Sequence, residues 1–144
     1  MPYYEDRGIR FAYPADWQTE VAEDGPRTTI TVQSPGGLAF ALVTIDETGA
    51  EPEELIAEAM DALREEYPTL DESPAADTLA GHRAIGRDIE FISLDLTNAC
   101  LIRGVRTPRR TLFLLGQWAE IDAEEDPEAI IDDLFRSIEE TDDD

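Results

Sequence analysis

The sequence contains no lysine, and it has only one cysteine and one histidine among its 144 residues. The single cysteine, Cys100, cannot form a disulfide within the chain, which is typical of a reducing compartment. One histidine and one cysteine also cannot supply the ligands of a closed tetrahedral zinc site. We expect His82, beside Gly81, to be a surface turn residue, and Cys100, within an apolar strand, to be a small core residue.

Long hydrophobic runs are also missing, and we expect no secretory leader. The opening residues 1–7 have neither the basic region nor the apolar region of a signal peptide. The longest apolar runs, such as 112–115, have the length of a strand and are too short to span a bilayer. We therefore expect a cytoplasmic protein that does not enter a membrane.

The motifs of several enzyme classes are absent too. The sequence has no G-x-S-x-G nucleophile elbow and no G-K-[ST] phosphate loop, and Gly36-Gly37 is typical of a turn. Two acidic clusters are present, and neither has the spacing of an EF-hand. The first comprises Asp122, Glu124, Glu125 and Asp126, and the second comprises residues 142–144. We expect no catalytic residue, no cofactor and no metal site. A carboxylate-based enzyme is the weaker alternative, because 34 acidic residues will always include a pair at the spacing of a cleft.

Negative charge dominates what is present, since 34 acidic residues against 11 basic ones give a formal net charge of −23 at pH 7. A field of this sign repels nucleic-acid phosphates and anionic lipid headgroups, so we expect neither as a partner. The charge favours a solvated, soluble surface. The functional alternative is a basic or cationic partner.

Alternating apolar residues predict a β-rich chain. Strands are expected at 9–13, 28–34, 38–45, 85–96, 98–105 and 111–118. Pro14 ends the first strand, and Trp17 is expected to plug the end of a core. The parity of apolar residues changes at Phe91-Ile92, which predicts a β-bulge or a bend there.

Two helices are expected, each with an apolar stripe at helical spacing. The first begins at Pro52 and ends before Pro68, and its stripe is Leu55, Ile56, Ala59, Met60, Leu63 and Tyr67. The second begins after an Asp126 cap, and its stripe is Ile130, Ile131, Leu134, Phe135 and Ile138. The segment 70–79 has weak periodicity and is expected to be a connector.

The length predicts a single domain covering residues 1–144. The expected core spans about residues 8–138, and residues 139–144 form an acidic tail that we expect to fray. No internal repeat or linker divides the chain.

Three short motifs make this sequence resemble PsbP-like domains. They are Tyr13-Pro14-Ala15-Asp16-Trp17, Leu79-Ala80-Gly81 and Phe135-Arg136-Ser137-Ile138, in the same order of elements from about Gly8 to about Ile138. The resemblance implies an α+β fold, a mostly antiparallel sheet with two main helices packed on its faces. It also implies a non-enzymatic role, because relatives such as DcrB-type proteins and Eag-type chaperones of type VI secretion bind other proteins. These relatives share no single binding surface, so no functional residue carries over.

One local feature opposes the global charge, namely an arginine-rich hairpin comprising Arg103, Arg106, Arg109 and Arg110. Such residues commonly protect a sheet edge and pair with nearby acids. The functional interpretation is a docking site for an acidic or carboxylate-bearing group, although alternation places Arg103 and Arg106 on opposite faces.

The sequence therefore predicts a protein-interaction module of the adaptor or chaperone type, either a monomer or a homodimer, whose partner is another protein. The alternative is a small-molecule or lipid-binding domain with a pocket between a helix and the sheet.

Overall fold

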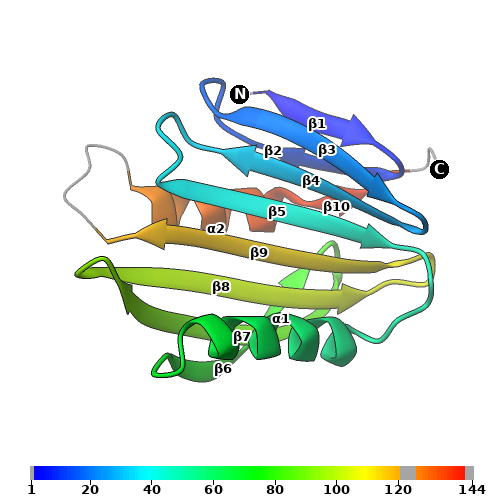
Figure 1. Cartoon of the computed structure of the whole chain (residues 1–144). Coiled ribbons are helices and arrows are strands. Elements are labelled where there is room, and N and C mark those ends of the chain that lie inside the picture. The colour runs from blue at the N-terminus through cyan, green and yellow to red at the C-terminus, as the bar shows by residue number, and fades with distance from the viewer. Residues whose placement is uncertain (1, 121–125, 142–144) are drawn as a thin grey trace.

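The structure is a computed structural model that describes residues 2–120 and 126–141. Its main feature is a seven-stranded sheet in the order β3-β4-β5-β9-β8-β7-β6, in which every neighbouring pair is antiparallel (Figure 1). The strands are β3 (Gln18–Asp24), β4 (Arg27–Gln33), β5 (Ala39–Asp46), β6 (Asp71–Leu79), β7 (His82–Ser93), β8 (Leu96–Arg106) and β9 (Thr111–Ala119).

A small second sheet and two helices cover this large sheet. The small sheet has the order β1-β2-β10, and its strands are β1 (Tyr3–Asp6), β2 (Ile9–Ala12) and β10 (Glu139–Glu140). Helix α1 (Pro52–Glu66) contacts β7, β8 and β9, whereas α2 (Pro127–Ser137) contacts β2, β5, β6 and β9. Figure 1 shows α1 in front of the large sheet and α2 behind it. The α+β class, the antiparallel sheet and the two helices predicted from the sequence are confirmed.

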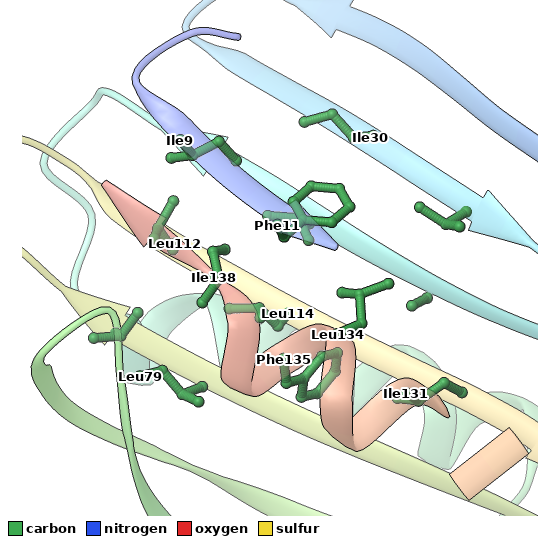
Figure 2. Close-up of a cluster of buried hydrophobic side chains, with 14 of the residues drawn as sticks. Ile9, Phe11, Ile30, Leu79, Leu112, Leu114, Ile131, Leu134, Phe135 and Ile138 are labelled. Carbon is green, nitrogen blue, oxygen red and sulfur yellow. The ribbon is translucent and has the colours of Figure 1, made fainter. Parts of the chain in front are cut away.

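Strand alternation divides the apolar residues between two cores. Leu112 and Leu114 of β9 face α2, where they join Ile131 and Leu134, and Figure 2 shows this cluster. Phe113, between them, faces α1, in a second cluster that contains Leu55, Ile56, Met60, Ile89, Phe91, Cys100 and Ile102. Burying both faces explains why the central strands are apolar at successive positions rather than at every second position.

The helices begin where the sequence indicates. Pro52 occupies the first turn of α1, and the carboxylates of Glu53 and Glu54 lie near the positive end of the helix dipole. The side chain of Asp126 caps α2 by accepting a hydrogen bond of 3.2 Å from the backbone N–H of Ala129. Both predicted helix starts are therefore confirmed.

The predicted connector at 70–79 is wrong, because this segment forms the edge strand β6 paired with β7 along its whole length. Its periodicity is weak because an edge strand buries few side chains, and only Leu79 is fully buried. Pro74 is tolerated because an edge strand has one side without ladder hydrogen bonds.

Of the β-bulge or bend predicted at Phe91-Ile92, the bulge is wrong. The register between β7 and β8 runs without interruption from Ala84↔Val105 to Ser93↔Leu96. The parity changes because the hairpin leaves the core here: Phe91 is buried, whereas Ile92 is 73% exposed and is followed by the turn.

The predicted acidic tail is only partly correct. Glu139 and Glu140 form β10 and pair with Arg10 and Ile9 of β2, since a third strand completes the small sheet. Residues 142–144 of the expected tail lie outside the described residues. Besides β6 and β10, two further strands, β1 and β3, had no counterpart in the sequence prediction. Strand β3 is exposed on both faces, which removes the apolar alternation.

Candidate functional site

The arginine-rich hairpin is the site that the sequence predicted, and the structure separates its members. Arg103 is 7% exposed, and its Nε lies 3.1 Å from Oδ2 of Asp77. Its Nη1 lies 2.9 Å from Oδ1 of Asp88. Because α2 contributes Arg136 to the same network, 3.7 Å from Asp77, Arg103 ties three strands to that helix.

Arg106 lies on the opposite side of the large sheet, as alternation predicted. Its Nη1 donates to the carbonyl oxygen of Gly49 at 2.8 Å, in the loop before α1. Its side chain remains exposed, so a partner-binding role for Arg106 stays a prediction.

Arg109 and Arg110 lie side by side at the hairpin tip, next to the small sheet. Arg110 is 5% exposed, and its Nη1 donates to the carbonyl oxygen of Arg7 at 3.1 Å. Arg109 is exposed and donates to the carbonyl oxygen of Thr141 at 3.2 Å. The structure thus brings together two of the four arginines, beside an open hollow of about 660 Å³ that Arg7, Glu23 and others also line.

The sequence predicted Cys100 to be a small core residue and His82 to be a surface turn residue. Cys100 is fully buried, and this burial raises the pKa of its thiol to about 12. His82 is half-buried at the start of β7. Across residues 2–120 and 126–141, no group of three or more His, Cys, Asp or Glu side chains could hold a metal ion. Of the first acidic cluster, Asp126 caps α2, whereas Asp122, Glu124 and Glu125 lie outside the described residues.

A different site is a groove of about 380 Å³ on the α2 side of the large sheet, which we call the acidic groove. It is lined by Asp71, Glu72, Ser73, Asp88, Ile89, Glu90, Ala99, Leu101, Trp118, Glu120 and Glu128. Register places Asp71, Glu90, Ala99 and Trp118 in one row across four strands. The acidic side chains of this row therefore lie on β6 and β7, and its apolar side chains lie on β8 and β9, where they form the floor of the groove.

The carboxylates of the acidic groove differ in whether they are neutralised. Asp88 pairs with Arg103. The side chain of Glu72 lies on the other side of the sheet, where it pairs with Arg64 of α1. In the described part of the chain, no ion pair is made by the other four, which are Asp71, Glu90, Glu120 and Glu128. All four are exposed, so the groove carries negative charge that the protein itself does not balance.

One pair in the groove runs against the stability of the sheet. Asp71 and Glu90 lie directly opposite each other on β6 and β7. Like charges in this position, with Cβ atoms about 5 Å apart, destabilise a sheet. Packing and pairing within the sheet therefore do not account for these two carboxylates.

Sequence reasoning missed the acidic groove, because its carboxylates come from four segments that are far apart in the sequence. The local signal was Asp88 and Glu90, which alternate on one face of the strand predicted at 85–96. In a chain with 34 acidic residues this signal does not stand out until the register of the strands is known.

The pocket between a helix and the sheet, expected for a ligand-binding domain, is small. A groove of about 180 Å³ lies between α1 and β7, and Ile56, Met60 and Ile85 contribute to its lining. Pockets for small molecules usually measure about 300–1,000 Å³. Among the described helices, none is long and apolar enough to cross a membrane.

Comparison with known proteins connects the chain to a fold. No family model matches the sequence, and no curated protein matches it. The structure is similar to cyanobacterial PsbP (CyanoP) from Synechocystis sp. PCC 6803, with a TM-score of 0.68 and 13% identity, over 96% of this chain and 91% of that one. It is also similar to LpqN of Mycobacterium tuberculosis, which is involved in cell envelope biogenesis, with a TM-score of 0.50 and 16% identity, over 94% of this chain and 86% of that one. The predicted PsbP-like fold is confirmed, and at these identities the likeness is one of fold alone.

Proposed function

We propose that this chain is a non-enzymatic protein-interaction module that binds a basic segment of a partner protein in its acidic groove. The observation that carries the proposal is the set of four unpaired carboxylates around an apolar floor of Leu101 and Trp118. A lysine or arginine side chain has an apolar stem and a charged end. The stem can pack on the apolar floor of the groove while the charged end pairs with a carboxylate beside it. This partner is the basic or cationic partner that the net charge of the sequence suggested as the functional alternative.

The role we propose is that of a cytoplasmic adaptor or chaperone, comparable in kind to the DcrB-type and Eag-type proteins among the relatives of PsbP-like domains. The lone cysteine supports the cytoplasmic part, because it is fully buried and is not needed to staple the fold. The exposed state of the groove carboxylates supports a binding role over a catalytic one, because a carboxyl general acid usually requires burial.

The test compares two variants that change charge equally. The groove variant carries Asp71→Asn, Glu90→Gln and Glu120→Gln, and a fluorescent decapeptide of alternating lysine and serine is the probe. Three exposed pairs at about 0.2–1 kcal/mol each predict that this variant binds the probe about tenfold more weakly. Fluorescence anisotropy at about 50 mM salt, where screening is modest, measures the affinity.

The matched control carries three substitutions of the same types at exposed sites outside the groove. These are Asp16→Asn, Glu54→Gln and Glu65→Gln. We expect the control to bind within about twofold of the wild type, because only the long-range field changes. Equal weakening of the groove variant and the control would show that net charge attracts the peptide and that the acidic groove is not a site.

A further inference from the structure

The tip of the β7–β8 hairpin exposes two large apolar side chains. Ile92 is 73% exposed and Leu94 is 93% exposed. We call these two residues the apolar tip. Because neither side chain joins either core, their apolar surface contributes little to folding.

The backbone at the apolar tip is unfavourable for the residue it holds. Ser93 pairs with Leu96, so the turn consists of Leu94 and Asp95, with φ angles of 54° and 63°. A two-residue turn with positive φ at both positions favours Asn-Gly, and a leucine in the left-handed region is strained. An observed strain of this kind, at an exposed position, points to a functional role for the side chain.

Two other hairpins of the same protein show how this turn is usually built. The β6–β7 turn is Ala80-Gly81, with φ angles of 52° and 77°, and the β1–β2 turn is Arg7-Gly8, with φ angles of 56° and 83°. Both place glycine at the second position. The β7–β8 turn has no glycine and puts a large apolar residue first, so its composition is not explained by turn geometry.

One residue of the apolar tip, Ile92, lies on the face of β7 that carries the acidic groove. Strand alternation puts Ile92 on the same face of β7 as Asp88 and Glu90, which line the groove. Thr97, opposite Ile92, accepts a hydrogen bond of 2.7 Å from the backbone N–H of Glu120, another groove residue. A segment lying along this face therefore meets acidic side chains first and exposed apolar side chains next.

We propose that the apolar tip receives apolar side chains of the same partner segment whose basic residues occupy the acidic groove. The inference rests on the proposed function, and it specifies the partner as a basic and amphipathic segment of a protein. Charge complementarity supports a protein over a membrane, because Glu90 and Asp95 flank the tip and would repel anionic lipid headgroups.

The test uses Leu94→Asn, which suits the left-handed turn and removes the apolar side chain. Two decapeptides serve as probes, one alternating lysine and leucine and the other alternating lysine and serine. The wild type should bind the lysine–leucine peptide about fivefold more tightly, as expected for partial burial of a leucine-sized surface. Leu94→Asn should abolish this preference, leave the affinity for the lysine–serine peptide unchanged, and keep or raise the melting temperature.

Val21→Asn is the matched control, because Val21 is 48% exposed on β3, the edge strand at the opposite end of the large sheet from β6. It should preserve the preference for the lysine–leucine peptide. Equal affinities of the wild type for the two peptides would overturn the role of the apolar tip and leave the groove proposal standing. Failure of the wild type to bind either peptide would overturn the proposed function and this inference together.

Vesicles of phosphatidylcholine provide the remaining arm of the test. Co-sedimentation of the wild type with these vesicles, lost in Leu94→Asn, would identify a lipid surface as the occupant of the tip and would overturn the inference. No co-sedimentation, together with the peptide preference, would support a protein partner.

Discussion

Gly116 of β9 allows α2 to approach the large sheet closely, and adding a methyl group there should disrupt that approach. A Cβ at position 116 would lie 2.3 Å from Cγ2 of Ile131, whose side chain is fully buried. Carbon atoms in contact lie about 3.5–4.0 Å apart. The Gly116→Ala variant therefore requires α2 to move away or Ile131 to leave its rotamer.

The expected cost follows from the buried position of Ile131. Overpacking of this kind costs about 1–3 kcal/mol, and we expect a value near 2 kcal/mol. For a chain of this size each kcal/mol lowers the melting temperature by roughly 3 °C, so a decrease of about 6 °C should follow. Urea and thermal unfolding of the purified variant measure the two quantities.

A double-mutant cycle with Ile131→Ala identifies the clash as the cause. Ile131→Ala alone should cost about 2–5 kcal/mol, because it empties a buried site. In the double variant the new methyl group occupies part of that space, so its destabilisation should be smaller than the sum of the single effects by about 1–2 kcal/mol.

Ile56→Ala gives the control, because Ile56 belongs to α1 on the other side of the sheet. Its effect should add to that of Gly116→Ala within about 0.5 kcal/mol. If Gly116→Ala unfolds at the same urea concentration as the wild type, or shows no coupling to Ile131→Ala, the close approach of α2 to β9 described here is incorrect.

Two further predictions concern buried charges. Burial alone would raise the pKa of Asp46, but hydrogen bonds from Thr48 and the Arg27 guanidinium, whose Nε lies 2.6 Å away, hold it below its usual value of 3.8. Asp46→Asn should therefore lower the free energy of unfolding at pH 7 by roughly 2 kcal/mol. The difference in stability between the variant and the wild type should shrink as the pH falls below about 4, because the wild-type carboxylate then becomes protonated. A difference that stays constant in urea titrations from pH 7 to pH 3 would contradict this prediction. Arg103→Met should lower the free energy of unfolding by about 2 kcal/mol, because it removes the contacts that the buried guanidinium makes with Asp77 and Asp88. Arg106→Ala should cost less than about 1 kcal/mol, because its side chain is exposed. Equal unfolding midpoints in urea would count against a structural role for Arg103.

Much of the fold could be predicted because its signals are local. Pro52 and Asp126 mark helix starts through backbone chemistry that needs no tertiary context. The β4–β5 hairpin is equally visible, since its alternation and its turn are close in sequence. Strands β3 and β6 were missed because both lie at sheet edges, where exposure on both faces removes the apolar alternation.

The candidate site was harder to predict, because it depends on which strands become neighbours. Asp71 and Glu90 are unremarkable in the sequence and meet only through the β6–β7 register. Conversely, the density of arginines near 103–110 suggested one surface. In the structure Arg103 and Arg110 are buried and form ion pairs with acidic residues. These partners are distant in the sequence, so the local density of arginines does not reveal them.

The position of β2 has a consequence for how the protein is made. Arg10 contacts Glu139 across 129 positions of sequence, and α2 packs on the same strand. A ribosome adding about 5–20 residues per second would take on the order of ten seconds to reach the later partners after the earlier strand is made. Throughout that interval Ile9 and Phe11, which are fully buried in the folded protein, lack the later residues that bury them. The nascent polypeptide must therefore avoid incorrect pairing of this apolar strand until elongation is almost complete.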